Sequence, residues 1–162
     1  MTITASLQLR PGLPADVQAM YALDLLCFDE PFRFDLRSMK RFSSQPGAIV
    51  LLAETEGAFL GFIIVQLSGR LPNRKAYIVT LDVHPSVRRR GIAHYLISEA
   101  ERSAAVAGAT SIYLHVYTEN VPALNFYGRL GYSRLLRNPD LYASGMDAWT
   151  YHKSLAAITS GL

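Results

Sequence analysis

The segment "LDVHPSVRRRGIA", residues 81–93, joins an apolar run to the longest helical pattern in the chain. Pro85 ends the predicted strand, and Gly91 opens a helix that the pattern extends to residue 107. The N–H groups at the start of a helix lack intrahelical partners and form a natural anion site. Gly91 lets a ligand approach the backbone closely, and Ala93 keeps the first turn free of bulk. The segment therefore predicts a strand–loop–helix connection that can cradle a phosphate group.

Other interpretations of the arginine run, Arg88–Arg90, compete with this one. Taken alone, three arginines are most often a solvated patch of surface charge. A Walker loop is excluded because no Gly-Lys-Ser/Thr follows, and a dinucleotide fingerprint is excluded because the three-glycine spacing is absent. A nucleic-acid reader needs a basic stripe or a basic recognition helix, and the chain has only this one dense basic run. We therefore expect no nucleic-acid partner.

The composition indicates one globular domain over residues 1–162. Hydrophobic residues make up 50% of the chain and charged residues 18%, which excludes a disordered protein. The net charge of +3 favours small anionic ligands only mildly. No apolar run approaches the roughly 18 residues of a membrane span, and the first residues lack the pattern of a signal peptide. With a single cysteine, Cys27, no internal disulfide forms, so we expect a cytoplasmic protein without membrane contacts.

Hydrophobic periodicity predicts an α+β protein built around one sheet. Asp35 and Asn120 are typical helix N-caps, Gly108 is a typical helix stop, and Glu56-Gly57 indicates a hairpin turn. The expected helices span residues 14–28, 35–42, 91–107 and 120–132. The expected strands span residues 6–10, 48–54, 58–67, 76–83, 111–116, 133–138 and 148–155.

Two motifs resemble the GNAT superfamily of N-acetyltransferases. Arg88-x-x-Gly91-x-Ala93, after a strand ending in "LDVHP", is similar to the acyl-CoA pyrophosphate loop of that superfamily. "YLHVYTENVPALNFYGRLGY", residues 113–132, resembles its later strand and helix. The resemblance implies the GNAT fold: a central mixed, mostly antiparallel sheet of six to seven strands, flanked by about four helices, with splayed central strands. It also implies acetyl-CoA as co-substrate.

Within the superfamily, the chain resembles the N-terminal protein acetyltransferases. "AYIVTLDVHPSVRRRGIA" (76–93), "IYLHVYTENVPALNFY" (112–127) and "LYASGMDAWTYHKSL" (141–155) look like the NatE-type catalytic subunit and its archaeal relatives. The bacterial RimI type is a more distant match, because its strand has a glutamate where this chain has His115. The resemblance implies direct acetyl transfer, in a ternary complex, to the α-amine of a protein or peptide N-terminus.

Other functions stay open at this point, and so does the oligomeric state. The same fold can acetylate a small-molecule amine, or bind acyl-CoA as a non-catalytic sensor. An assay that offers peptides and, in parallel, polyamines and aminoglycosides as acceptors distinguishes the small-molecule alternative from a peptide acceptor. Against the second stands a full set of residues that match the superfamily's catalytic groups: Tyr77, His115, Asn120 and Tyr127.

The resemblance assigns three groups of residues to the cofactor. Backbone groups of Leu81, Asp82 and Val83 are implied to bind the pantetheine arm as an added strand. Asn120 is implied to contact the cofactor near the thioester, although it is equally well explained as a helix cap, and Ala123 and Tyr127 are implied to contact the cofactor as well. The pyrophosphate is implied to lie on backbone N–H groups of the loop and first helical turn: Arg88, Arg89, Arg90, Gly91, Ile92 and Ala93.

Catalytic roles follow from the same resemblance. Tyr127 matches the tyrosine that protonates the departing thiolate, and Tyr77 with His115 matches a pair that deprotonates the amine through water. Each has a simpler alternative, a core aromatic or a packed strand histidine. Cys27 is more typical of a packed thiol than of a nucleophile. We expect no metal, because His84, His94 and His152 lack ligand spacing.

The acceptor side is implied to come from two loops. "FDEPFRF", residues 28–34, contains Pro31 and Phe32, which match a peptide-clamping segment. Leu141 and Tyr142, expected in the penultimate loop, match a second such segment, and Tyr77 faces the same acceptor. Ordinary packing of a loop onto the core is the alternative explanation.

Overall fold

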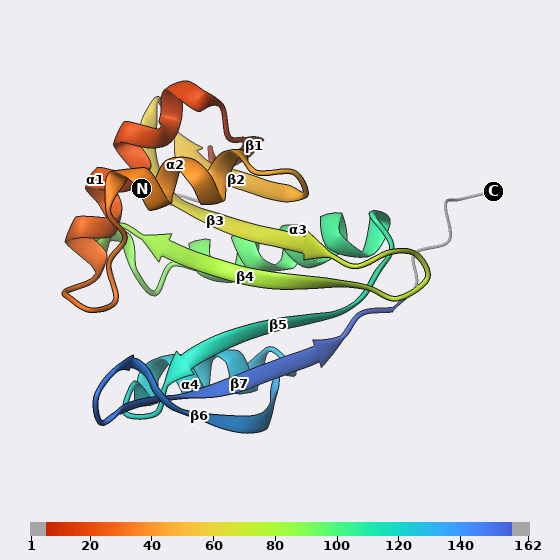
Figure 1. Ribbon diagram of the computed structural model, residues 1–162. Coiled ribbons are helices and arrows are strands. Elements are labelled where there is room, and N and C mark those ends of the chain that lie inside the picture. The colour runs from red at the N-terminus through yellow and green to blue at the C-terminus, as the bar shows by residue number, and fades with distance from the viewer. Residues whose placement is uncertain (1–5, 157–162) are drawn as a thin grey trace.

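Seven strands form one sheet in the computed structural model, which describes residues 6–156 (Figure 1). Its strand order is β1-β2-β3-β4-β5-β7-β6. The strands are β1 (Gln8–Pro11), β2 (Ala48–Thr55), β3 (Ala58–Ser68), β4 (Arg74–Val83), β5 (Ala109–Tyr117), β6 (Ser133–Ala143) and β7 (Met146–Ser154). The helices are α1 (Val17–Cys27), α2 (Leu36–Ser44), α3 (Ile92–Val106) and α4 (Val121–Arg129), with 3₁₀ turns at Pro14–Asp16 and Pro85–Val87.

The helices cover both faces of the sheet. On one face, α1 and α2 bury an apolar cluster that includes Met20, Leu23 and Met39 against Phe62 of β3. On the other face, α3 buries Ile92, Leu96, Ile97, Ala100 and Ala104, and α4 packs into the same cluster. Burying one such leucine or isoleucine stabilises the fold by roughly 1.5–3 kcal/mol. The two helix layers therefore bury both faces of the sheet.

The expected α+β GNAT fold is confirmed, including its mixed sheet. Every strand pair is antiparallel except β4 and β5, which run parallel. The long helix begins after Gly91, at a φ of 84°, and ends before Gly108, at a φ of 92°. Side chains with a Cβ rarely adopt such angles, which explains why glycine marks both ends. Within residues 6–156, no helix combines the length and apolar composition needed to cross a membrane.

The central strands are splayed, as expected. β4 and β5 pair only where Arg74–Tyr77 lie beside Ala109–Tyr113, and beyond that point the two strands diverge (Figure 1). Val79 contributes to this divergence because it is an extra residue in β4: Ile78 pairs with Val65 of β3, and Thr80 pairs with Ile64. Such a bulge bends its strand and increases the local twist. The end of β4 therefore turns an unpaired edge toward β5.

One expectation about the C-terminal hairpin is wrong. Leu141 and Tyr142 lie in β6, which continues to Ala143, and not in a loop between strands. Pro139 and Asp140 suggest a turn, but edge strands tolerate proline and β6 is an edge strand with an irregular register here. The Asp147 carboxylate accepts bonds from the Asp140 N–H and from Arg137 Nε, both at 2.8 Å. These bonds hold the irregular segment against β7.

Candidate active site

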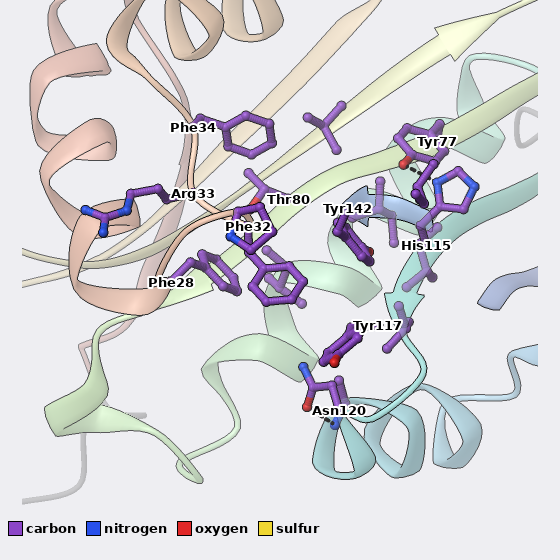
Figure 2. Close-up of a pocket in the computed structure, with 18 of the residues that line it drawn as sticks. Phe28, Phe32, Arg33, Phe34, Tyr77, Thr80, His115, Tyr117, Asn120 and Tyr142 are labelled. Atoms are coloured by element: carbon purple, nitrogen blue, oxygen red, sulfur yellow. Dashed lines mark hydrogen bonds between the residues drawn. The ribbon is translucent and has the colours of Figure 1, made fainter. Parts of the chain in front are cut away.

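A cleft of about 970 Å³ opens where β4 and β5 separate. Figure 2 shows its wall, to which the α1–α2 loop, the two strands, the start of α4 and the end of β6 all contribute. Such clefts, mostly apolar with a few convergent polar groups, are the usual form of a small-molecule or catalytic site. The polar lining residues are Arg33, Tyr77, Thr80, His115, Tyr117, Asn120, Tyr127 and Tyr142.

Tyr77 and His115 meet at the mouth of the splay. Tyr77 is the last residue of β4 in register with β5, and His115 lies two residues beyond its partner Tyr113. The Tyr77 hydroxyl is 2.6 Å from His115 Nδ1, a hydrogen bond in which either atom can donate (Figure 2). Burial raises the pKa of Tyr77 and lowers the pKa of His115 below its ordinary value of 6.5. Both groups are therefore neutral at pH 7, and when Nδ1–H donates to the Tyr77 oxygen, Nε2 of the imidazole is free to accept a proton.

Tyr127 lines the same cleft from α4. Its ring packs edge-on against Phe126 and Tyr132, at centroid distances of 5.1 and 5.5 Å. Burial, followed by the charge of Asp82, raises the pKa of Tyr127 above its ordinary range. The phenol is thus a protonated group at neutral pH, held by its aromatic neighbours, and can act as a proton donor.

Asn120 caps α4 and also lines the cleft. Its side-chain oxygen accepts a bond from the Ala123 N–H at 3.3 Å, as the cap interpretation expects. The cap uses only the carbonyl oxygen, so the amide NH₂ remains a donor for a ligand. Ala123 lines the cleft as well, and its small side chain leaves space beside Asn120. The cap and a ligand contact are therefore compatible.

Three aromatic rings from distant segments meet in the wall of the cleft. The Phe32 ring lies 5.2 Å from that of Tyr117 and 4.8 Å from that of Tyr142, next to Pro31 (Figure 2). Burial raises the pKa of Tyr142 to about 12, so its hydroxyl remains a hydrogen-bond donor at neutral pH. These contacts join the α1–α2 loop to β5 and β6 and form an aromatic wall.

Tyr117 is a member of this wall that sequence reasoning missed. It belongs to β5, where side chains alternate between the two faces of the sheet. Counting by two from His115 puts Tyr117 on the same side as His115, and that spacing is the signal that could have found it. Its hydroxyl donates to the Glu119 carboxylate, which fixes the ring at the edge of the cleft.

The unpaired edge of β4 continues from the cleft toward α3. The His84 N–H donates to the Leu60 carbonyl of β3 at 2.8 Å. Successive residues of a strand direct their backbone N–H and C=O groups to opposite sides. The backbone groups of Asp82 therefore point toward β3, and those of Leu81 and Val83 point toward the open edge. The Val83 carbonyl already accepts from Arg88 Nε at 3.2 Å and from the Cys27 thiol at 3.4 Å. The geometry therefore favours Leu81 and Val83 over Asp82 as partners for an added strand.

The arginine run, Arg88–Arg90, forms a loop between β4 and α3, which we call the arginine loop. It lies beyond the end of β4 and outside the cleft lining. Arg88, Arg89 and Arg90 are exposed, and Arg89 has a φ of 64°. The first intrahelical bond of α3 runs from the Tyr95 N–H to the Gly91 carbonyl at 3.0 Å, so the amides of Ile92 and Ala93 precede the hydrogen-bond ladder. A Cβ built on Gly91 would meet no atom within 4 Å. The loop thus offers free amides beside open space, which suits an anion.

Cys27 fits the interpretation of a packed thiol. Cys27 is half-buried, and burial raises the pKa of its thiol, so it is not a thiolate at neutral pH. Among residues 6–156, no three His, Cys, Asp or Glu side chains gather as metal ligands would.

Comparisons with known proteins agree with this geometry. A profile of the acetyltransferase (GNAT) family matches residues 17–132. An "N-alpha-acetyltransferase" of Sulfurisphaera tokodaii is 26% identical over 153 residues, covering 88% of this chain and 89% of its own length. The "N-alpha-acetyltransferase MAK3" of Arabidopsis thaliana is 33% identical over 101 residues, 62% of this chain and 53% of its own length.

Solved structures share the fold. The ribosomal-protein-S18-alanine N-acetyltransferase of Escherichia coli superposes with a TM-score of 0.82 at 17% identity, covering 96% of this chain and 98% of its own. NAA60 of Arabidopsis thaliana, in complex with acetyl-CoA, gives 0.81 at 20% identity, covering 93% of this chain and 99% of its own. Since the family profile spans most of the chain and the fold agrees, the protein belongs to the acetyltransferase (GNAT) family.

Proposed function

We propose that the protein transfers the acetyl group of acetyl-CoA to the N-terminal α-amine of a protein or peptide. The observation that carries the proposal is the neutral Tyr77–His115 pair at the mouth of the splay, in one cleft with the protonated phenol of Tyr127. A base and an acid that line one cleft from different elements suit an amine that must lose a proton and a thiolate that must gain one. The names of the curated relatives support the α-amine as acceptor.

The strength of this base matches an α-amine better than a lysine. An α-amine with a pKa of about 7.7–8.0 loses its proton at pH 7 at a cost of about 1–1.4 kcal/mol, against about 4.6 kcal/mol for lysine at about 10.4. A half-buried imidazole with a lowered pKa is a weak base, adequate for the smaller cost. The juxtaposition of amine and thioester supplies a further term of about 7–11 kcal/mol in favourable geometry.

The residues divide the work as follows. His115, with Tyr77, accepts the amine proton directly or through a water in the cleft, and Tyr127 donates its proton to the departing sulfur. Asn120 and the open edge at Leu81 and Val83 orient the pantetheine arm, and the first amides of α3 hold the pyrophosphate. The acetyl thioester supplies the activated acyl group. The aromatic wall of Phe32, Tyr117 and Tyr142 excludes water around the acceptor.

The test is an acetylation assay on a peptide library, read by mass spectrometry that locates the modified nitrogen. Peptides with free N-termini should be acetylated on the α-nitrogen, and the same peptides with blocked N-termini should not react at their lysines. Polyamines and aminoglycosides serve as a parallel panel. Modification of lysine side chains, or of the small amines alone, rejects the proposal.

Gly91→Glu is expected to weaken acetyl-CoA binding at least about tenfold, since it places a carboxylate where the pyrophosphate should lie. Gly91→Ala is the matched control, because it has the same cost of a left-handed residue, about 1 kcal/mol, without the charge. Calorimetry on both folded variants measures the difference. Equal affinities for the two variants would remove the arginine loop from the cofactor site.

Tyr142→Ala should raise the peptide KM about tenfold and leave the acetyl-CoA KM within twofold, because the ring packs on Phe32 at the acceptor side. Tyr142→Phe keeps the ring and removes only the hydroxyl, so it separates packing from a hydrogen bond to the peptide. Steady-state kinetics with each substrate varied in turn gives both constants. Similar changes in the two KM values would exclude Tyr142 from the acceptor site.

A further inference from the structure

Two carboxyl groups lie buried between α1 and β4. Asp24 is 0% exposed and Asp82 is 1% exposed. One oxygen of each is accounted for: Asp24 Oδ2 accepts from the Phe34 N–H at 2.8 Å, and Asp82 Oδ1 accepts from the Thr80 hydroxyl. The other two oxygens, Asp24 Oδ1 and Asp82 Oδ2, are the only buried side-chain polar atoms within residues 6–156 that lack a partner.

The two unpartnered oxygens lie where α1 packs against β4. The Cys27 thiol, one helical turn after Asp24, is 3.4 Å from the carbonyl oxygen of Val83, the residue after Asp82, so the two carboxyl groups face each other across this contact. Both residues adjoin the apolar cluster under α1: Asp24 follows Leu23 in the helix, and Asp82 pairs with Phe62 of β3. Two negative charges side by side in such a place repel each other and lose their hydration. A single proton held between them removes one charge and gives both oxygens a partner at once. Aspartic protease dyads behave in this way for the same reason.

The other charged and titratable groups nearby do not replace that proton. Arg88, from the loop after β4, favours the ionised form of Asp82, but less strongly than burial and Asp24 oppose it. The pKa of Asp82 is therefore raised well above its ordinary value of 3.8, first by burial and next by Asp24. Cys27 of α1 and Tyr127 of α4, the remaining neighbours, both have raised pKa values and stay neutral.

We propose that Asp24 and Asp82 share one proton, and that this hydrogen bond fixes the acceptor loop, residues 28–34, against the cofactor strand β4. The connection is continuous: the Phe34 N–H, at the end of the loop, bonds to Asp24, Asp24 bonds through the proton to Asp82, and Asp82 belongs to β4. Neither aspartate lines the cleft, whereas Phe34 does. Both are positioning residues, and their role in acetyl transfer rests on the function proposed above.

The first test is the pH dependence of unfolding for Asp82→Asn. The amide donates a permanent hydrogen bond to Asp24, still accepts from Thr80, and needs no proton. A folded-state pKa raised above the unfolded one makes stability fall as pH rises from about 3.8 to the raised value. The unfolding equilibrium constant of the parent, relative to Asp82→Asn, should rise about tenfold per pH unit across that window, for one proton.

Urea titrations from pH 4 to 9 measure this ratio. Asp147→Asn is the control, because the Asp140 N–H and Arg137 hold the pKa of Asp147 below its ordinary value. That carboxylate stabilises the fold above about pH 3.8 and loses its effect only as pH falls, so its ratio to the parent should be flat above pH 5. Parallel curves for Asp82→Asn and the parent would overturn the shared proton.

The second test asks whether the Asp24–Asp82 hydrogen bond fixes residues 28–34, and we call this bond the clamp. The readout is hydrogen exchange at the Phe34 amide. In Asp82→Ala, Asp24 loses its partner, and hydrogen exchange at the Phe34 N–H should accelerate at least about tenfold relative to amides of α3. Asp82→Asn should keep parental protection and so rescue the clamp. In the acetylation assay, Asp82→Ala should raise the peptide KM at least fivefold, with the acetyl-CoA KM within twofold, and Asp82→Asn should restore it.

Unchanged exchange at Phe34 in Asp82→Ala, or equal changes in the two KM values, would overturn the positioning role. If Asp82→Ala does not fold, Asp82→Leu, which fills the volume without a hydrogen-bonding group, replaces it in the exchange and kinetic measurements, with the same expected results. Asp24→Asn is a second variant for the urea titrations, where it should flatten the pH dependence. Unfolding and hydrogen exchange require no acceptor. A failure of the clamp is therefore distinguishable from a failure of the proposed function, which the peptide library reports separately.

Discussion

Replacing His115 with alanine is expected to lower kcat about 100-fold at pH 7 while acetyl-CoA affinity stays unchanged. The side chain bonds to Tyr77 at 2.6 Å within the cleft, whereas the arginine loop proposed to hold the cofactor lies outside the cleft lining, so we expect the cofactor to lose no contact. The deficit should shrink as pH rises past about 8, where an α-amine is already neutral and needs no base. The measurement is kcat from pH 6 to 9.5, for the variant and the parent.

His152→Ala is the matched control for this prediction. His152 lies on β7, stacks on Tyr113 at 5.8 Å, and does not line the cleft, so its loss should leave kcat within a few-fold of the parent. The parent itself should be fully active at pH 7, because burial lowers the pKa of His115 and keeps the imidazole unprotonated there. Parental activity of His115→Ala at pH 7 would return His115 to the interpretation of a packed strand histidine.

Local sequence signals predicted the elements of the fold well because each is set by neighbours in the chain. The glycines at 91 and 108 bound α3, Glu56 and Gly57 form the turn between β2 and β3, and the Asp35 side chain caps α2 by accepting from the Ser38 N–H. The extent of β6 was not predictable in this way. Pro139 and Asp140 are turn formers by themselves, and only the edge position and the bonds from Asp147 keep them in a strand.

Contacts between distant strands needed more than local signals. The Tyr77–His115 bond depends on the register of two parallel strands 38 residues apart, which hydrophobic periodicity does not fix. Only the resemblance to a known family pointed to that pair. The pair of Asp24 and Asp82 was missed for the same reason, although one signal was present. Asp24 follows Val17 by seven positions and so shares its buried helix face, an unusual place for a carboxylate.

Tyr127→Phe is expected to lower kcat by about 100-fold, and this loss should persist or grow as pH rises. The substitution keeps the ring between Phe126 and Tyr132 and removes only the hydroxyl, so the fold and the cofactor affinity should survive. The missing group is a proton donor, which burial keeps protonated in the parent by raising its pKa. Alkaline solution removes protons and cannot substitute for a donor. The opposite pH responses of Tyr127→Phe and His115→Ala therefore separate the acid from the base.

Tyr132→Phe removes a neighbouring hydroxyl that bonds to Glu101 at 2.8 Å, outside the cleft, and controls for the loss of a phenol in the same aromatic cluster. It should leave kcat near the parental value, even if the lost bond costs about 1 kcal/mol of stability. The kcat–pH profiles of the three variants and the parent are compared under one set of conditions. If Tyr127→Phe and His115→Ala show the same pH-independent loss, the two residues do not act as separate acid and base. If Tyr132→Phe is as slow as Tyr127→Phe, the loss does not report a proton donor, because the Tyr132 hydroxyl bonds to Glu101 outside the cleft and cannot reach the departing thiolate.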